Sequence, residues 1–218
     1  MNLKLAVIVS VRTNSKRLPA KAFLPINGKP SCLFLLERLK NGLNFSLHVA
    51  TTTHPSDDFL YSLLTEQGYS AYRGSENNVF ERLLSLSETL NLDYLVRITA
   101  DCPLLDSKLV NDLVAQALTQ EGWILATTKG EHPAGFDIEI LSLKEMIRIR
   151  HNLTAYEEEH VSAHFYVNLR ESEILRLKHP HLSAPNGSYL LDTLDDFLFL
   201  NEFIRRNGAN FSPVKFNL

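Results

Sequence analysis

Short apolar runs alternate with segments of helical periodicity over the first half of the chain, and this alternation limits the folds available to it. The runs are rich in β-branched, aromatic or leucine residues and span 3–11, 44–52, 68–74 and 93–100. The segments between them repeat apolar residues at helical spacing and span 31–42, 57–68 and 77–90. Strands that alternate with helices of about 12 residues form right-handed βαβ units with parallel strands. The pattern predicts a parallel sheet with helices on both faces.

The second half of the chain contains further strands and helices in a less regular order. We expect a helix over 107–120 with Asp106 as its N-cap, and strands over 123–128 and 135–141. The other expected elements are a helix near 156–168, a strand near 173–178, a short strand at 189–191 and a helix over 194–207. Because no repeat or linker interrupts the series, we predict one domain over 1–218. Its architecture is expected to be α/β, a three-layer α/β/α Rossmann-like arrangement with a mostly parallel sheet.

Composition disfavours several functional classes. No apolar run reaches the roughly 18 residues that span a bilayer, and the apolar start is followed by Arg12 instead of a signal-peptide cleavage site. Cys32 and Cys102 form no CxxC pair, so we expect two buried thiols in a reducing compartment and a cytoplasmic location. The 22 basic and 25 acidic residues give a net charge of −3, which argues against a nucleic-acid-binding protein.

The positive charges are concentrated near the start of the chain. Six cations precede the first acidic residue, Glu37, and the loop 11–21 that follows the first expected strand contains Arg12, Lys16, Arg17 and Lys21. Doubly wound sheets bind ligands at the carboxyl ends of their strands, and the turn after the first strand often receives phosphate. A triphosphate needs Arg and Lys side chains together with backbone N–H groups. The loop therefore favours phosphate binding over a merely solvated basic loop, although it contains neither a Walker A nor a GxGxxG motif.

Carboxylates are expected on the same rim of the sheet as this loop. Asp101 follows the expected strand 93–100, where it could bind Mg²⁺ through one carboxylate or simply form a turn before Pro103. Asp192 precedes the last expected helix, and Thr193 with Asp196 forms a plausible capping pair, which leaves Asp192 free for another role.

Other polar side chains leave alternatives open. Asp137 and Glu139 alternate along 135–141, so both face one side of a strand that either contacts substrate or lies at a solvated edge. Arg97 alternates with apolar neighbours and either faces the site or forms an ion pair. His160 and His164 share a helical spacing, but the HExxH motif is absent and no third ligand is evident, which argues against zinc.

A series of motifs along the chain carries a family resemblance. The loop VRTNSKRLPAK and the following NGKP resemble the nucleotide-binding signature of cytidylyltransferases that activate sugars. The likeness continues in ATTTHPSDD, YRGSENNVFERL, VRITADCPLLD, HPAGFDIEIL, EEHVSAHFY and LDTLDDF. The chain resembles the spore-coat polysaccharide biosynthesis protein F-like family, relatives of the CMP-Kdo synthetases and acylneuraminate cytidylyltransferases. The matches cover nearly the whole chain.

This resemblance implies a fold of the nucleotide-diphospho-sugar transferase type and a specific reaction. CMP would pass from CTP to a sugar or another small oxyanion acceptor, pyrophosphate would leave, and the product would serve surface polysaccharide synthesis. The partners would be CTP and the acceptor, with no nucleic acid or membrane, and the relatives suggest a homodimer.

The resemblance also assigns roles to individual residues. Arg12, Ser15, Arg17 and Lys21 would hold the triphosphate, and the three cations would neutralise the leaving pyrophosphate. Asp101 and Asp192 would hold Mg²⁺. Further candidates are Thr99 for the nucleotide, and Arg97, Asp137, Glu139 and His160 for the acceptor.

The phosphate loop departs from the family at two positions. Asn14 and Ala20 stand where family members usually have glycine, and Asn tolerates a left-handed backbone better than Ala does. Two other functions therefore stay open. One is a metal-dependent glycosyltransferase of related fold that uses Asp137 and Glu139, or Asp101. The other is a nucleotide-binding protein without catalytic activity.

Overall fold

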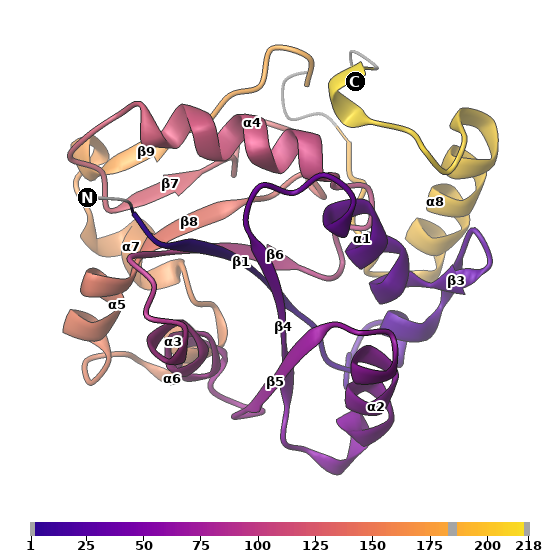
Figure 1. The fold of residues 1–218 in the computed structure, drawn as a ribbon, viewed down its shortest axis with the longest axis horizontal. Coiled ribbons are helices and arrows are strands. Elements are labelled where there is room, and N and C mark those ends of the chain that lie inside the picture. Colours follow the sequence, from indigo (N-terminus) through magenta and orange to yellow (C-terminus); the bar gives the residue numbers. More distant parts are fainter. Residues whose placement is uncertain (1–2, 183–186, 216–218) are drawn as a thin grey trace.

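A seven-stranded sheet in the order β5-β4-β1-β6-β8-β7-β9 forms the centre of the protein (Figure 1). The structure is a computed structural model that describes residues 3–182 and 187–215. The strands are β1 (Leu5–Ser10), β4 (Ser46–Thr52), β5 (Ser70–Gly74), β6 (Tyr94–Thr99), β7 (Leu125–Thr127), β8 (Glu139–Ser142) and β9 (Ile174–Arg176). Neighbouring strands are parallel except where β8 pairs with β6 and β7. The predicted, mostly parallel sheet is confirmed.

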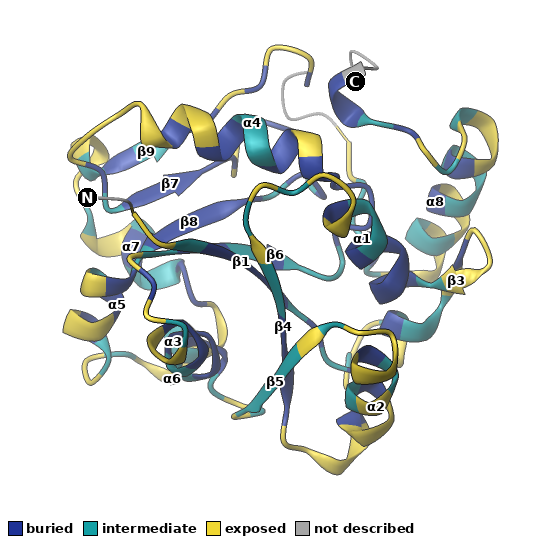
Figure 2. Ribbon diagram, viewed as in Figure 1, coloured by how far each residue is buried: buried dark blue, intermediate teal, exposed yellow. Residues whose placement is uncertain are grey.

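Eight α-helices lie on the two faces of this sheet in the described part of the chain. They are α1 (Ser31–Lys40), α2 (Asp58–Glu66), α3 (Val79–Thr89), α4 (Ser107–Leu118), α5 (Leu143–Ile149), α6 (Ala155–Glu159), α7 (Ala163–Asn168) and α8 (Leu194–Asn207). One apolar core joins the sheet to α1, α2, α4 and α8, and a second joins it to α3, α5 and α7. Figure 2 shows the buried residues concentrated along the central strands. The three-layer prediction is confirmed.

Alternation within the strands supplies both cores. Along β1, Val7 and Val9 enter the first core, whereas Ala6 and Ile8 enter the second, and all four are buried. Successive side chains of a strand point to opposite faces, so a continuously apolar strand suits a sheet covered on both sides.

Smaller elements complete the backbone. Strands β2 (Pro25–Ile26) and β3 (Lys29–Pro30) form a hairpin whose turn residues, Asn27 and Gly28, have φ angles of 50° and 76°. This Asn-Gly turn is the sequence that two-residue hairpins favour. The short 3₁₀ helices of the described residues are η1 (Lys21–Phe23), η2 (Pro55–Asp57), η3 (Glu171–Glu173) and η4 (Pro213–Lys215).

Two helix starts match their sequence signals. The Asp106 carboxylate accepts a hydrogen bond from the Leu109 N–H at 2.9 Å, as expected of the N-cap of α4. Thr193 and Asp196 form a reciprocal capping box at the start of α8. Both capping predictions are confirmed.

The second half of the chain differs from the prediction in four places. The helix expected near 156–168 is divided into α6 and α7, because Val161 between them turns inward and is fully buried in the second core. Strand β8 begins only at Glu139, and α5, which was not predicted, follows it directly. Residues 189–191 form no strand; instead Tyr189 N–H bonds to Ala134 O at 2.7 Å and Leu191 N–H to Asp101 O at 2.8 Å.

Two further features concern the expected buried thiols and the search for membrane-spanning helices. Cys32 and Cys102 are both buried and free. Over residues 3–182 and 187–215, no helix combines the length and apolar character needed to cross a membrane.

The segment that leads to Asp192 rests against Gly135, and this contact gives a stability prediction. A Cβ at Gly135, where φ is +100°, would lie 2.5 Å from the Tyr189 carbonyl carbon and 2.7 Å from its oxygen. We expect Gly135→Ala to lower the free energy of unfolding by more than about 3 kcal/mol, measured by urea denaturation, because two backbone segments must separate.

Gly130→Ala is the matched control. Gly130 has φ +82°, but no atom lies within 4 Å of the position that its Cβ would take, so only backbone strain of about 1 kcal/mol is expected. Equal losses in the two variants would show that the close approach at Gly135 contributes nothing.

Candidate active site

A cleft of about 580 Å³ opens at the carboxyl ends of β1 and β6. Its walls come from the loop after β1, the start of α3, strand β6 with the turn after it, the end of α6 and the residue before the N-cap of α8. The structure brings together, along this cleft, most of the residues predicted for the site: Arg12, Ser15, Arg17, Lys21, Arg97, Thr99, Asp101, His160 and Asp192. Asp137 and Glu139 are not part of its lining.

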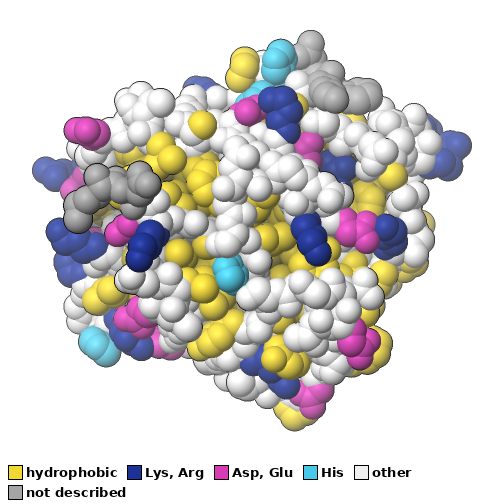
Figure 3. Space-filling view, viewed as in Figure 1, with side chains coloured by type: hydrophobic (Ala, Val, Ile, Leu, Met, Phe, Trp, Pro, Cys, Tyr) yellow, Lys and Arg dark blue, Asp and Glu magenta, His cyan; other side chains and the backbone are white. Residues whose placement is uncertain are grey.

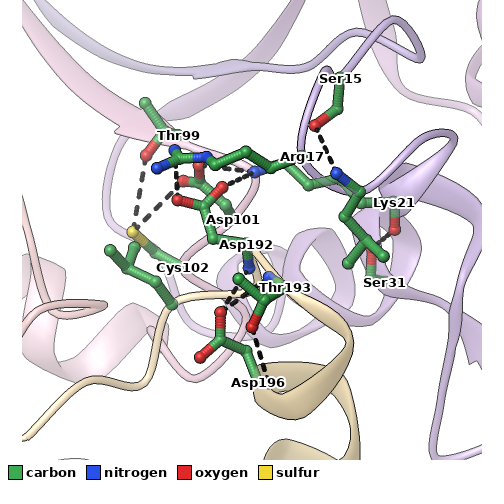
Figure 4. Close-up of polar contacts among 12 residues, drawn as sticks. Ser15, Arg17, Lys21, Ser31, Thr99, Asp101, Cys102, Asp192, Thr193 and Asp196 are labelled. Carbon is green, nitrogen blue, oxygen red and sulfur yellow. Dashed lines mark hydrogen bonds and ion pairs between the residues drawn. The ribbon is translucent and has the colours of Figure 1, made fainter.

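Lys21 joins the two carboxylates predicted for the metal. Its Nζ lies 3.0 Å from Asp101 Oδ2 and 2.8 Å from Asp192 Oδ1, and Arg17 also forms an ion pair with Asp192 (Figure 4). Burial alone would lower the pKa of Lys21, but the two carboxylates outweigh it and raise that pKa. Burial would likewise raise the pKa of Asp101, yet Lys21 and a hydrogen bond from Thr99 lower it. Lys21 and Asp101 are therefore held in their charged forms.

The backbone places both carboxylates on this rim. Asp101 lies in the turn after β6, which is closed by Cys102 N–H bonding to Thr99 O at 3.1 Å. The Leu191 N–H then donates to Asp101 O, so the two acidic positions are tied together through the main chain. Because Asp196 accepts hydrogen bonds from the backbone N–H groups of Asp192 and Thr193, the Asp192 carboxylate is left to face Lys21.

Two carboxylates that share one cation make a donor set suited to Mg²⁺. Mg²⁺ takes one or two protein carboxylates and completes its octahedron with phosphate oxygens and water, whereas catalytic zinc takes three protein ligands. Residues 3–182 and 187–215 contain no cluster of three or more His, Cys, Asp or Glu side chains that could hold a metal. His164 instead pairs with Glu157 at 2.8 Å. The donor chemistry fits Mg²⁺ at Asp101 and Asp192.

The basic loop 11–21 is closed by hydrogen bonds to the Thr13 carbonyl. The Thr13 carbonyl accepts the N–H of Ser15 at 2.9 Å and the N–H of Ala20 at 3.1 Å. Arg12, at the start of the loop, pairs with Glu159 of α6 at 3.1 Å. The loop thus presents its cations to the cleft from a folded, hydrogen-bonded backbone.

The two departures from glycine in this loop have different outcomes. Asn14 does not adopt the left-handed conformation that its residue type would tolerate; its side chain donates to Glu76 at 3.3 Å. Ala20 does adopt it, with φ 55° and ψ 25°. A left-handed alanine is strained because its Cβ approaches the following carbonyl oxygen. The strain expected at a missing glycine therefore falls on Ala20 alone.

An ion pair between neighbouring strands joins the inner wall of the cleft to a buried carboxylate behind it. Arg97 of β6 lies opposite Glu139 of β8 in the register and forms an ion pair with it. Glu139 also accepts a hydrogen bond from the Tyr166 hydroxyl at 3.0 Å. Burial would raise the pKa of Glu139, but Arg97 and these hydrogen bonds lower it. Both interpretations of Arg97 hold, since it lines the cleft and is ion-paired.

Strand β8 lies between β6 and β7, which excludes one of the two alternatives for Asp137 and Glu139, that of a solvated edge strand. Asp137 lies just before β8, and burial together with the nearby charge of Glu139 raises its pKa. Neither carboxylate reaches the cleft itself, so any part they play in acceptor binding passes through Arg97 or the backbone.

Several residues at or near the cleft were not among the predicted site residues, and three of them carry charges that bear on the loop or the cleft. Arg82 of α3 lines it with only 2% of its surface exposed, and its Nη1 donates to Ser75 O at 2.5 Å. Burial and the charges of Arg12 and Arg97 lower the pKa of Arg82 to about 10. Glu159 is the partner of Arg12, and Asp57 contacts Thr13 from outside the loop. Arg82 stood in a matched motif, but the sequence did not separate a cleft position from a structural ion pair.

Comparison with known proteins agrees with this geometry. A family model described as cytidylyltransferase matches residues 6–187. An uncharacterized protein of Methanocaldococcus jannaschii is 30% identical, over 89% of this chain and 81% of its own length. The spore coat polysaccharide biosynthesis protein SpsF of Bacillus subtilis is 26% identical, over 92% of this chain and 86% of its own. A solved cytidylyltransferase from Leptospira borgpetersenii is 29% identical with a TM-score of 0.90, covering 98% of this chain and 92% of that one.

The strain at Ala20 gives a testable prediction. Replacing Ala20 by Gly removes the left-handed alanine at some cost in unfolded-chain entropy, and we expect a net gain of about 1 kcal/mol in the free energy of unfolding. For a chain of this length, that corresponds to a rise of about 2–4 °C in Tm by calorimetry.

Asn91→Gly serves as the control because Asn91 has a similar φ of 53° but lies away from the cleft. Asn tolerates this conformation, so its replacement should change the free energy of unfolding by less than about 0.5 kcal/mol. A destabilised Ala20→Gly variant would contradict the assignment of strain to this position.

Proposed function

The chain belongs to the cytidylyltransferase family and is a nucleotidyltransferase, and from this premise we propose that it transfers CMP from CTP to a small sugar-like acceptor with release of pyrophosphate. One observation carries the proposal: Lys21 of the basic loop meets Asp101 and Asp192 in a single cleft. Cations suited to phosphate oxygens and carboxylates suited to Mg²⁺ are thereby brought within reach of one bound nucleotide.

The basic loop would bind and orient the triphosphate. Arg12, Arg17 and Lys21 would neutralise the leaving pyrophosphate, and Ser15 and Thr99 would add hydroxyl contacts to the nucleotide. In such a transfer an acceptor oxygen attacks the α-phosphorus and the bond to the pyrophosphate oxygen breaks. Positioning and charge stabilisation supply most of the catalysis in this class of reaction, and no covalent nucleophile is needed.

Asp101 and Asp192 would hold Mg²⁺, which when bound supplies positive charge to the reacting phosphate. In the structure these carboxylates are neutralised by Lys21 and Arg17. When a triphosphate draws the two cations toward its own oxygens, the carboxylates are left to a divalent ion. Nucleotide and metal would therefore favour each other's binding.

The acceptor would lie beside Arg97 and His160, with Glu139 holding Arg97 from behind and Asp137 just before the same strand. Similarity to the spore coat polysaccharide biosynthesis protein supports a role in surface polysaccharide assembly. We further propose a single domain acting in the cytoplasm, where CTP is made, and a homodimer. Figure 3 shows Lys and Arg side chains scattered among acidic and apolar ones on one face, which supports a small-molecule substrate over a nucleic acid.

The two alternative functions make different demands on the site. A glycosyltransferase that used Asp137 and Glu139 for its metal would need both carboxylates at the cleft, whereas Glu139 is held by Arg97 and neither residue lines the cleft. A protein without catalytic activity would bind CTP yet release no pyrophosphate. Pyrophosphate release from CTP with a panel of acidic and neutral sugars separates the three functions.

Substitutions at the central contact give the sharpest prediction. Lys21→Met should abolish the thermal shift that CTP and Mg²⁺ produce, since the Lys21 ammonium contacts both carboxylates and lies in the wall of the cleft. Asp101→Asn and Asp192→Asn should each lower the rate of pyrophosphate release by about 100-fold or more, as removing one group that stabilises transition-state charge commonly does.

Surface residues of the same types provide controls. Lys29, which pairs with Glu37 outside the cleft, and Asp195, exposed in the first turn of α8, should tolerate Lys29→Met and Asp195→Asn without effect. Unchanged CTP binding in Lys21→Met, or full activity in both aspartate variants, would refute the proposed site.

A further inference from the structure

A buried carboxylate outside the cleft reaches the phosphate loop from another part of the chain. Asp57 ends η2, between β4 and α2, and is 1% exposed. Its Oδ1 accepts two hydrogen bonds from Thr13, at 2.8 Å from the backbone N–H and at 2.6 Å from the hydroxyl. Its Oδ2 accepts the hydroxyl of Thr52, at the end of β4.

Hydrogen bonds keep this carboxylate charged in spite of its burial. A buried charge is costly unless polar partners replace its hydration. Burial would raise the pKa of Asp57, but the donors on Thr13 and Thr52 outweigh it and lower that pKa. The negative charge of Asp57 also offsets the buried guanidinium of Arg82. Asp57 is thus an ionised anchor held on one side by β4 and on the other by the loop.

Thr13 transmits this anchor to the rest of the loop. Its carbonyl accepts the N–H groups of Ser15 and Ala20, which close the loop around the residues between them. Asp57 therefore holds Thr13, the same residue whose carbonyl accepts both hydrogen bonds that close the loop. Arg12 directly precedes this residue, and Lys21 directly follows Ala20.

The loop needs an external anchor because of its own sequence. It contains no glycine, and its Ala20 is held in a left-handed conformation. Such backbone conformations persist only where surrounding contacts over-determine them. The hydrogen bonds from Thr13 to Asp57 supply a contact of this kind, since they hold the carbonyl to which Ala20 is bonded.

We propose that Asp57 is a positioning residue for nucleotide binding: it holds Thr13 so that the loop presents Arg12, Arg17 and Lys21 to the triphosphate in a preorganised arrangement. The residue does not line the cleft and acts through the loop. The nucleotide part of this inference rests on the proposed function, while the ordering of residues 11–21 by Asp57 does not.

Two variants and a control test the inference. Asp57→Asn replaces one acceptor oxygen by an N–H₂ group and removes the charge, and Thr13→Val removes the hydroxyl while leaving the backbone N–H. Since hydrogen bonds to a charged group are among the stronger ones, we expect CTP affinity to fall about 10-fold to 100-fold in Asp57→Asn and less in Thr13→Val. Asp58→Asn alters the adjacent exposed carboxylate, which pairs with Arg73 away from the loop, and should bind CTP as the wild type does.

Calorimetric titration with CTP and Mg²⁺ measures the affinities, and hydrogen exchange reports loop order in the same proteins. We expect the amides of residues 13–18 and 20 to exchange faster in Asp57→Asn while those of β1 and β6 keep their protection. In the double variant Asp57→Asn/Thr13→Val, the loss of CTP affinity should be smaller than the product of the two single losses. Both changes weaken the same hydrogen bond between Thr13 and Asp57, so their effects should not add. In steady-state assays the KM for CTP should rise while the KM for the acceptor stays constant.

The outcomes distinguish the positioning role of Asp57 from the proposed binding of CTP. Wild-type affinity in Asp57→Asn, or loss of protection spread evenly over the sheet, would overturn the positioning role. If Asp57→Asn does not fold, a double-mutant cycle of Thr13→Val and Thr52→Val tests the same role, because both hydroxyls donate to Asp57. Additive effects of the two changes on CTP affinity, with unchanged hydrogen exchange in the loop, would also overturn the positioning role. Failure of the wild-type protein to bind CTP would instead refute the proposed function, and faster exchange of residues 13–18 and 20 would still show the anchor.

Discussion

The contact of Lys21 with Asp101 and Asp192 is the interaction on which the arrangement of the cleft depends. It joins the loop after β1, the turn after β6 and the residue before the α8 cap, segments separated by 80 and 171 residues in the chain. All three groups are half-buried, and each would be destabilising there without a partner, because removing a charge from water is costly unless an opposite charge compensates it. Each is stabilised by the others, and together they set one cation between two carboxylates. In the free protein, the cation that a nucleotide would bind and the carboxylates that a metal ion would bind are thus paired with each other.

Local sequence pattern predicts the fold of the first half of the chain but not that of the last third. The first half of the chain was predictable because its strands are apolar on both faces and its helices are long and periodic, so that local pattern and tertiary environment agree. In the last third the elements before α8 are short, and contacts between distant segments decide them. Val161 interrupts a helical pattern because it packs into the second core, and residues 189–191 bond to Ala134 and Asp101 instead of joining the sheet.

The candidate site shows the same division between local and long-range information. Asp101 and the basic loop could be placed on one rim because both follow parallel strands, and the capping pair at Thr193 indicated that Asp192 was free for another role. The environment of Glu139 could not be predicted, since it depends on β8 lying between β6 and β7. Asp57 carried no local signal either, because its partner Thr13 lies 44 residues earlier. The local sequence pattern does not predict which residues, distant in the chain, contact each other in the folded protein.

The proposed chemistry requires the cleft to bind a nucleotide and a divalent ion together. The most direct measurement is calorimetric titration of the wild-type protein with CTP, in Mg²⁺ and again in excess EDTA. Because Lys21 and Arg17 neutralise Asp101 and Asp192 in the free protein, each ligand must release groups that the other needs. The account predicts CTP binding in Mg²⁺ that weakens by about 10-fold or more in EDTA, a coupling near 1.4 kcal/mol or above. Equal affinity under both conditions, or no binding under either, would contradict it.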